Sequence, residues 1–447
     1  MGNLFGTGGA RGIANQELTP ELAFKLGRAG SFVLSHKVAR PRILVGRDTR
    51  ISGDMLESAL VAGICSVGAD VLKAGVIPTP GVAYLTQKYQ ASCGVVISAS
   101  HNPMEYNGIK FFGPEGYKLP DEVEDEIERL VFNQDEIRAR PEGGDIGRVY
   151  ELDKASQNYI NFLMRCYRGT RDLKGLKVVV DCANGAAYEV APQMWEEMGT
   201  KVIPIHNQPS GLNINERCGS TYPGALRRAV LEHHADLGVA YDGDADRVVA
   251  VDERGNIIDG DHIMVICGLH LQRSSLLNPP KVVTTVMSNI GLDIAFRREK
   301  VEVLSCQVGD RYVLERMQES GARLGGEQSG HIIFLDYATT GDGLLSSLKL
   351  AEVMRETGLP LSELAREMEQ YPQMLINLDI KDKDSILNSM EVQDAIRQAE
   401  ERLGEWGKVL VRPSGTEPKI RIMAQGPDEF LLQEVVDKIK TAVLKVK

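Results

Sequence analysis

The sequence of 447 residues lacks several features that would place it in common classes of protein. It contains no apolar run near the roughly 20 residues that a membrane-spanning helix needs. Its seven cysteines form no CxxC pair, and such an odd, scattered set is typical of buried, reduced thiols. The first residues include Gly, Thr and Arg where a signal peptide carries an apolar core. These absences predict a cytoplasmic protein without a membrane partner.

Signatures for nucleotides and nucleic acids are missing or broken. No GxxxxGK[ST] segment occurs, so a P-loop kinase is unsupported. The segment Gly6–Gly12 nearly matches a dinucleotide fingerprint, but Arg11 occupies the third glycine position and no strand precedes it. A Gly-rich loop that presents Arg11 to an anion fits better. The formal net charge of −11 offers no basic face for nucleic acid, so any anionic ligand is expected to be small.

The sequence does contain a repeated order of elements. Apolar runs at 42–45, 69–77 and 95–97 alternate with amphipathic segments at 55–67 and 82–89, which is typical of a parallel sheet. Similar cycles begin near residues 176 and 261. From about Tyr371 the expected order is strand, helix, strand, strand, helix. The expected domains are 1–153, 154–253, 254–368 and 369–447.

The first cycle delivers a polar loop, Ser98-Ala99-Ser100-His101-Asn102-Pro103, directly after the apolar run Gly94–Ile97. Ligands of open α/β sheets collect beyond the carboxyl ends of strands. Ser100 in this loop is therefore a candidate nucleophile. An ordinary turn would also explain Ser, Asn and Pro, and this segment alone does not decide between the two.

The second cycle delivers Asp242, Asp244 and Asp246 at positions i, i+2 and i+4. Three carboxylates so close repel one another unless a cation lies between them, and oxygen ligands favour Mg²⁺, Mn²⁺ or Ca²⁺. An EF-hand would place its bidentate ligand at Glu253, but Arg247 occupies the position of the required glycine. A phosphatase loop in which Asp242 itself is phosphorylated is another alternative.

Two later loops add candidates for sugar and phosphate binding. The glycine-rich segment Gly325–His331 contains Glu327 and Ser329, which could bind sugar hydroxyls, and His331, which could serve in acid/base chemistry. The segment Arg412–Pro418, followed by Arg421, offers guanidinium groups, hydroxyls and backbone amides for a phosphate cradle. A plain hairpin turn explains the arginines less well. Lys110 is either a surface lysine or a proton donor that faces phosphate.

Taken in this order, the four loops resemble the reactive-serine, metal, sugar and phosphate loops of the α-D-phosphohexomutases, and the resemblance covers essentially the whole chain. Segments 211–216, 326–331 and 412–418 are similar to those of the bacterial members that act on glucosamine phosphates. Members that act on mannose or glucose phosphates more often have another residue at Gln328. One departure is Gly8, because the family usually has Asp there.

The resemblance implies an α/β fold with three mixed α/β/α sheet domains of similar topology. A C-terminal α+β domain would resemble the TATA-binding-protein fold, and the active cleft would lie between all four. It also implies a phosphoserine at Ser100 and one Mg²⁺ held by Ser100 and the three aspartates. A hexosamine 1,6-bisphosphate would be the intermediate, and the protein would be a monomer or a homodimer.

The implied reaction interconverts glucosamine 6-phosphate and glucosamine 1-phosphate, which feeds UDP-N-acetylglucosamine and cell-wall precursor synthesis. A phosphomannomutase or phosphoglucomutase of the same family, or a phosphatase using Asp242, remain as alternatives. The implied roles are transition-state contact for Arg11 and Arg247, proton transfer for Lys110 and His331, positioning of the phosphoserine for His101, and substrate binding for Glu327, Ser329, Arg412, Ser414, Gly415, Thr416 and Arg421.

Overall fold

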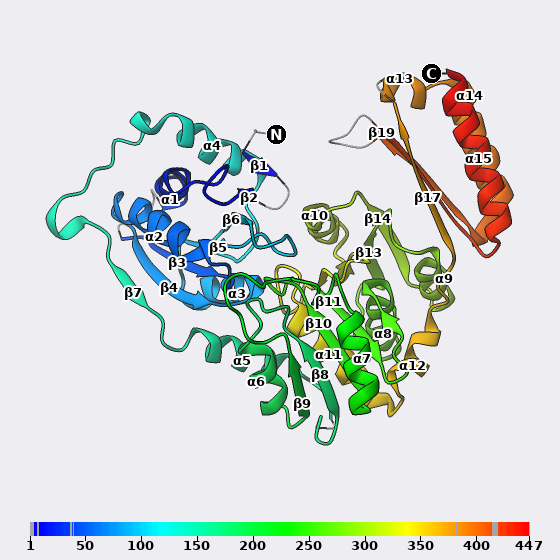
Figure 1. The fold of residues 1–447 in the computed structure, drawn as a ribbon, viewed down its shortest axis with the longest axis horizontal. Helices are drawn as coiled ribbons and strands as arrows, with labels where there is room; N and C mark the ends of the chain where they lie inside the picture. Colours follow the sequence, from blue (N-terminus) through cyan, green and yellow to red (C-terminus); the bar gives the residue numbers. More distant parts are fainter. Residues whose placement is uncertain are drawn as a thin grey trace.

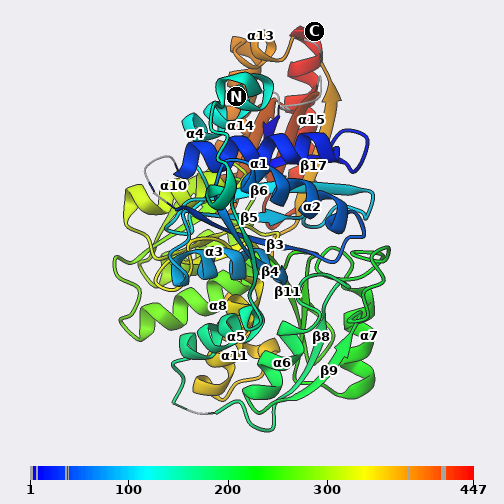
Figure 2. The same cartoon turned by 90° about the vertical axis from the view of Figure 1, so that its left-hand side faces the viewer.

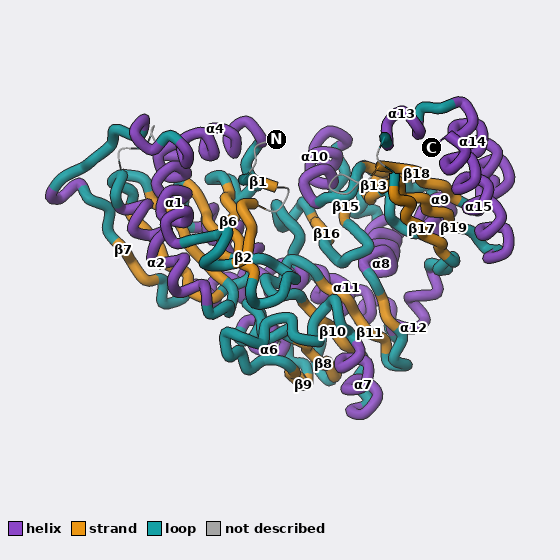
Figure 3. The backbone as a smooth tube through the Cα atoms, turned by 45° about the horizontal axis from the view of Figure 1, so that its top comes forward, coloured by secondary structure: helices purple, strands orange, loops and turns teal. Residues whose placement is uncertain are grey.

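The computed structural model describes residues 4–6, 9–35, 38, 40–170, 172–380, 382–413 and 419–446. Four units follow one another along the chain, each built on its own sheet (Figure 1). Helices lie along the strands of every unit (Figure 3). The predicted class, three mixed α/β sheet units and a smaller C-terminal α+β unit, is confirmed. No helix among the described residues is long and apolar enough to cross a membrane.

The first unit is a seven-stranded mixed sheet. Its strands are β1 (Phe5–Gly6), β2 (Gly9–Ile13), β3 (Arg42–Arg47), β4 (Asp70–Val76), β5 (Cys93–Ile97), β6 (Tyr106–Phe112) and β7 (Val149–Glu151), and its helices are α1 (Pro20–Ser35), α2 (Ser52–Cys65), α3 (Thr79–Lys88) and α4 (Asp121–Phe132). The order is β1-β2-β6-β5-β3-β4-β7. The predicted parallel pattern covers β3, β4 and β5, whereas β6 runs antiparallel to both β2 and β5. Helices α1 and α2 approach closely at Gly63. A Cβ at this position would lie 2.1 Å from the carbonyl oxygen of Phe24, so the close approach requires a glycine.

The second unit has a five-stranded sheet in the order β12-β11-β10-β8-β9. Its elements are α5 (Ala155–Cys166), β8 (Lys177–Asp181), α6 (Val190–Glu197), β9 (Lys201–Ile205), α7 (Gly224–His233), β10 (Leu237–Tyr241), β11 (Val248–Asp252) and β12 (Ile257–Ile258). Strands β10 and β11 are antiparallel, so the chain reverses between Tyr241 and Val248. This reversal carries the acidic loop.

The third unit has the sheet order β14-β13-β15-β16. Its elements are α8 (Gly260–Arg273), β13 (Lys281–Thr285), α9 (Ile290–Arg298), β14 (Glu302–Cys306), α10 (Asp310–Ser320), β15 (Leu324–Gly326), β16 (Ile332–Phe334), α11 (Gly343–Thr357) and α12 (Leu361–Leu364). Strands β15 and β16 form a hairpin, and its turn contains residues 327–331.

The fourth unit is a three-stranded antiparallel sheet in the order β17-β19-β18, with the long helices α14 and α15 on one face (Figure 1). Its elements are β17 (Gln373–Asp379), α13 (Lys383–Leu387), α14 (Met390–Leu403), β18 (Lys408–Pro413), β19 (Lys419–Gln425) and α15 (Glu429–Val446). The order of these elements agrees with the prediction. In Figure 2 the unit again lies at one end of the molecule.

The apolar cores divide the molecule into two packed bodies. One continuous cluster joins the first three units and includes Val82 of α3, Tyr159 of α5, Trp195 of α6 and Phe296 of α9. The fourth unit has a separate cluster, to which Ile422 of β19 belongs. Because burial of apolar side chains is the main favourable contribution to folding, the first three units form one packed body and the fourth packs on its own core.

Candidate active site

Ser100 lies in the turn after β5, at the carboxyl edge of the first sheet. Its backbone is in the left-handed region, with φ of 52°. Such a conformation costs a serine roughly 1–3 kcal/mol, so neighbouring groups must hold it. The side chain is buried, and its hydroxyl donates a hydrogen bond of 2.6 Å to Oδ2 of Asp242. The structure therefore brings the candidate nucleophile into direct contact with the acidic loop.

A buried guanidinium holds this turn in place. Arg50 is completely buried and pairs with Asp48 at 2.9 Å. Its Nη2 donates to the carbonyl oxygens of Ser100 (2.9 Å) and Asn102 (2.8 Å), and its Nη1 donates to that of Pro103. Sequence reasoning missed Arg50. A signal was available, because Asp48–Arg50 follows β3, the parallel neighbour of β5, and the ends of parallel neighbours meet at one edge.

The second unit contributes another contact to the same turn. Asn215 donates through Nδ2 to the carbonyl oxygens of Ser100 (2.8 Å) and Asn102 (3.1 Å). Asn215 belongs to the segment 211–216, which the sequence analysis noted only for its family resemblance. Its side chain links the loop between β9 and α7 to the turn of Ser100.

The three aspartates of the acidic loop form a compact, buried group. One carboxylate oxygen from each of Asp242, Asp244 and Asp246 lies within 4.8 Å of the others. Burial, together with the charges of Asp246 and Asp244, raises the pKa of Asp242 to about 8. The Oδ1 atoms of Asp244 and Asp246 are buried without a hydrogen-bond partner among the described residues. Buried oxygens without donors and mutual repulsion both fit a hard divalent cation such as Mg²⁺.

The geometry argues against the EF-hand alternative. Residues Val248–Asp252 form the buried strand β11 directly after the acidic loop. Glu253, the expected twelfth ligand of a calcium loop, instead accepts a hydrogen bond of 3.2 Å from the backbone amide of Ser362. The acidic loop therefore belongs to a strand–loop–strand reversal and not to a helix–loop–helix calcium site.

Cationic side chains from two units surround the acidic loop. Lys110 of β6 is buried and its Nζ lies 2.6 Å from Oδ2 of Asp244, which also accepts a hydrogen bond from Thr79. Burial alone would lower the pKa of Lys110, but the charges of Asp244 and Asp246 raise it, so the group is an ammonium ion. Lys110 therefore neutralises part of the acidic cluster.

Arg247 and His101 meet beside Ser100. Nη1 of Arg247 lies 3.2 Å from Nδ1 of His101, and Ser100 Oγ lies 3.4 Å from the same nitrogen. Burial and the charges of Arg247 and Arg11 lower the pKa of His101 to about 4. A neutral imidazole that accepts from Arg247 is suited to holding a neighbour and poorly suited to donating a proton. Arg11 of β2 is exposed and donates to Asn102.

A cavity of about 420 Å³ lies beside Ser100 and the acidic loop. Its lining comes from the first three units and comprises Gly6, Gly9, Arg11, Ser100, His101, Lys110, Lys118, Asp246, Arg247, Val308, Gly309, Asp310 and Glu327. Lys118 and Asp310, which the sequence analysis did not single out, pair with each other across it. Glu327 faces the cavity and its Oε1 accepts from the Gly309 amide at 3.1 Å. Ser329 is exposed and is not part of this lining.

His331 is oriented toward the acidic loop. It is buried, its Nδ1 lies 3.7 Å from Oδ2 of Asp246, and its Nε2 accepts a hydrogen bond of 3.1 Å from the Gly341 amide. Because Nε2 is an acceptor, the ring proton is on Nδ1 and faces Asp246. His331 is not among the residues that line the cavity, whereas its carboxylate neighbours Asp246 and Asp310 (3.9 Å from Nε2) are.

Two arginines of the fourth unit lie side by side. Arg412 of β18 and Arg421 of β19 are direct partners in the antiparallel ladder, so their side chains leave the sheet on the same face. Burial and the charge of Arg421 lower the pKa of Arg412. Neither arginine is part of the cavity lining. The predicted ligands Ser414, Gly415 and Thr416, and the divergent Gly8, lie outside the described residues.

Comparison with known families covers most of the chain. Residues 2–138, 157–255 and 259–371 match "Phosphoglucomutase/phosphomannomutase, alpha/beta/alpha" domains I, II and III, and residues 375–442 match the C-terminal domain of the same family. Two relatives described as "Phosphoglucosamine mutase", from Syntrophomonas wolfei subsp. wolfei and Clostridioides difficile, are 66% and 54% identical. Each alignment covers 99% of both chains.

Solved structures share the fold. A phosphoglucomutase/phosphomannomutase family protein from Burkholderia thailandensis superimposes with a TM-score of 0.82 at 24% identity, over 99% of this chain and 97% of the other. An N-acetylglucosamine-phosphate mutase in a product complex gives a TM-score of 0.65 at 17% identity, over 98% and 96%. The four family models and the full-length relatives identify the chain as a member of the phosphoglucomutase/phosphomannomutase family, the α-D-phosphohexomutases.

Proposed function

We propose that the protein interconverts glucosamine 6-phosphate and glucosamine 1-phosphate through a phosphoserine at Ser100. The observation that carries this proposal is the contact between the Ser100 hydroxyl and Asp242, at the wall of a cavity that Ser100, Lys110 and Arg247 line. The relatives described as phosphoglucosamine mutase support the choice of sugar. The product would feed UDP-N-acetylglucosamine and cell-wall precursor synthesis in the cytoplasm.

The proposed chemistry is phosphoryl transfer in two directions. The O1 hydroxyl of the substrate attacks the phosphorus of phosphoserine; an O1–P bond forms, the P–Oγ bond of Ser100 breaks, and a 1,6-bisphosphate results. Asp242, Asp244 and Asp246, with the oxygen on Ser100, would hold Mg²⁺, which neutralises charge on the transferring group when bound. Arg11 and Arg247 line the cavity and stabilise the same negative charge.

Proton transfer is assigned to Lys110. As an ammonium ion, Lys110 donates the proton that the departing Oγ takes up, and the resulting amine takes up the proton that the attacking hydroxyl releases. Lys110 lines the cavity, whereas His331 faces Asp246. We therefore assign His331 to the positioning of Asp246, in place of the proton transfer that the sequence suggested, and keep His101 as the residue that steadies the phosphoserine.

The bisphosphate must turn over so that its 6-phosphate meets Ser100, which requires a second anion site. Arg412 and Arg421 supply it, because an anion between two neighbouring guanidinium groups relieves their repulsion. Glu327, and Ser329 on the same hairpin, would bind sugar hydroxyls in both orientations. Since a single chain supplies every group, the reaction would run in a monomer or in each subunit of a homodimer.

The test compares turnover of glucosamine, mannose and glucose 6-phosphates, together with intact mass and peptide mapping of the protein. We expect glucosamine 6-phosphate to be preferred and one additional phosphate to map to Ser100. Preference for mannose or glucose phosphates would point to the other branch of the family. Release of phosphate without isomerisation, or phosphate on Asp242, would point to a phosphatase.

A further inference from the structure

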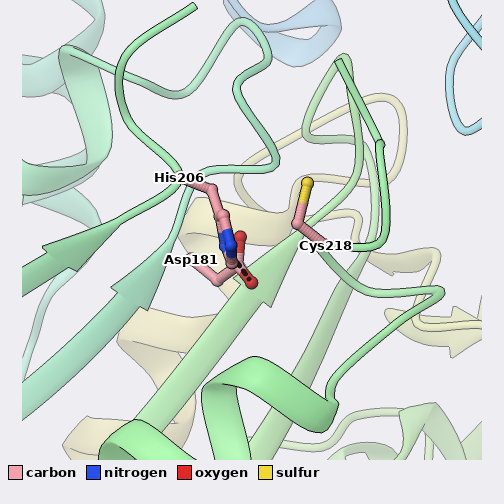
Figure 4. A group of neighbouring side chains, drawn as sticks. All are labelled: Asp181, His206 and Cys218. Atoms are coloured by element: carbon pink, nitrogen blue, oxygen red, sulfur yellow. Dashed lines mark ion pairs between the residues drawn. The ribbon is translucent and has the colours of Figure 1, made fainter. Parts of the chain in front are cut away.

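Three metal-ligating side chains meet in the second unit, in a cluster separate from the acidic loop (Figure 4). Asp181 ends β8, His206 follows β9, and Cys218 lies in the loop before α7. Strands β8 and β9 are parallel neighbours, with Asp181 opposite Ile205, which places His206 beside Asp181. One ligand atom from each of the three residues lies within 4.8 Å of the others. Asp181 and Cys218 are fully buried, and the His206 side chain is 30% exposed.

An ion pair and backbone amides fix the ligand atoms of this cluster. Nδ1 of His206 pairs with Oδ2 of Asp181 at 3.0 Å. Oδ2 of Asp181 also accepts from the Gly219 amide at 3.1 Å, and Oδ1 accepts from the Ala183 amide at 2.9 Å. The nitrogen and the oxygen are therefore adjacent and held in place, with a ligand atom of Cys218 within 4.8 Å of both, which is the closeness that three ligands of one cation need.

The backbone around the cluster is held in unusual conformations. Ala183, Asn184 and His206 all have positive φ, between 47° and 52°. The Asn184 amide donates to the carbonyl oxygen of His206 at 2.6 Å, which locks the two loops together. For Ala183 this conformation costs roughly 1–3 kcal/mol and persists only when the surroundings impose it, whereas Asn and His adopt it more readily. The two loops therefore present Asp181 and His206 in fixed positions.

We propose that Asp181, His206 and Cys218 form a binding site for a borderline divalent cation of the zinc class, with a fourth position open to water. Imidazole and thiolate ligands select Zn²⁺ over Mg²⁺, and three protein ligands with one open position are a usual zinc arrangement. The site thus differs in chemistry from the all-carboxylate loop at Asp242. Binding converts the Cys218 thiol to a thiolate and releases its proton to solvent.

The position of the site connects it to the reactive serine. His206 and Cys218 flank the segment 207–217, and within it Asn215 donates to the carbonyl oxygen of Ser100. A cation bound to both residues would close this segment into a loop. The closed loop would have less conformational freedom than the segment has without the cation. The cation would therefore stabilise the loop that supports the turn of Ser100.

The test uses the full chain, stripped of metal and then supplied with excess Mg²⁺ to satisfy the acidic loop. Co²⁺ is titrated as a spectroscopic probe and Zn²⁺ as its competitor. We expect one equivalent of Co²⁺ to bind with sulfur-to-metal charge-transfer absorption that Zn²⁺ removes and Mg²⁺ does not. The variants C218S and H206A should lose this band and bind Zn²⁺ more than about tenfold more weakly. The variants C182S, at a neighbouring buried thiol, and D244N should keep the band.

Two results would overturn the proposal, and neither depends on a variant that fails to fold. One is wild-type protein that binds Co²⁺ without sulfur-to-metal charge transfer. The other is a band that survives in both C218S and H206A, since another cysteine would then be the ligand. Melting of each variant in the presence of chelator, compared with wild type, reports whether it is folded.

Discussion

The hydroxyl of Ser100 donates a 2.6 Å hydrogen bond to Oδ2 of Asp242, across the boundary between the first and second sheets. Asp242 is buried, and burial with two neighbouring carboxylates raises its pKa to about 8. An ionised Asp242 therefore needs positive charge close by. The serine and the acidic loop are in this way one site, and changes on either side of the contact test its proposed roles.

Ser100→Ala should lower mutase turnover at least about 10³-fold, because it removes the oxygen that carries the phosphoryl group. The assay uses glucosamine 6-phosphate with saturating 1,6-bisphosphate. Ser98→Ala is the comparison: Ser98 Oγ donates to Asp48 and accepts from the Ser100 amide, so its loss removes one support of the turn but keeps the Ser100 hydroxyl itself. Phosphate should still map to Ser100 in that variant. Substantial turnover by Ser100→Ala would refute the nucleophile assignment.

Asp244→Asn should shift the Mg²⁺ dependence of activity to at least about tenfold higher concentrations, since it removes one anionic ligand while keeping the size of the side chain. The measurement is a Mg²⁺ titration of turnover. Asp236 is an exposed carboxylate just before β10, and Asp236→Asn serves as the control. Its turnover should depend on the Mg²⁺ concentration as that of the wild type does. An unchanged curve for Asp244→Asn would mean that the three aspartates have a structural role only.

Arg50→Ala should reduce the free energy of unfolding by about 3–5 kcal/mol, because it leaves a buried carboxylate at Asp48 without its counter-ion. It also removes the donor to the carbonyl of Ser100. Denaturant unfolding measures the loss. Arg254→Ala is the comparison: its side chain is 55% exposed and forms surface pairs, so it should cost less than about 1 kcal/mol. Equal stability of both variants would show that the buried pair is not needed.

The loops that carry the candidate site follow from local patterns. Each of these strands can be predicted from a short run of apolar residues. The loops at Ser100, Asp242 and Glu327 each follow the end of such a strand. Chain order and residue type therefore suffice to find them. The position of Lys110 is harder to predict. Lys110 lies on the antiparallel strand β6, whose pairing with β2 and β5 is determined only when the sheet assembles.

The contacts that hold the site depend on tertiary structure and escape sequence reasoning. Arg50 resembles any loop arginine until the sheet brings its guanidinium to the carbonyls around Ser100. The role suggested for His331 depended on its proximity to Glu327 in the chain, whereas its orientation depends on the Gly341 amide. Partners far apart in sequence thus determine which polar groups face the cavity.

Arg421→Gln should raise the KM for glucosamine 6-phosphate about 10- to 100-fold, because a charge-assisted hydrogen bond contributes about 1.5–3 kcal/mol. The value of kcat should change less if Arg421 binds the non-reacting phosphate. Steady-state kinetics separate the two. Arg402→Gln, on the exposed surface of α14 in the same unit, should leave both values unchanged. An unaltered KM in Arg421→Gln would place the second phosphate elsewhere.

Asp261 at the start of α8 should make the protein less stable as the pH rises from about 4 to 7. It is buried, and burial with the charge of Asp259 raises its pKa to about 7, although the Asn289 amide donates to it and His262 is close. Lys408 supplies positive charge from β18. An unfolded aspartate titrates near pH 4, so between these values the unfolded chain loses a proton that the folded chain keeps. Stability then falls by up to about 1.4 kcal/mol per pH unit.

Asp261→Asn cannot titrate and should remove this slope, so the variant should melt at a higher temperature than wild type at pH 8 and similarly at pH 4. Thermal melting of both proteins at intervals across this range tests the expectation. Asp236→Asn controls for the removal of one exposed charge and should follow the wild-type curve. If Asp261→Asn keeps the wild-type slope between pH 4 and 7, another group is responsible for the pH dependence, and Asp261 is ionised in the folded protein throughout this range.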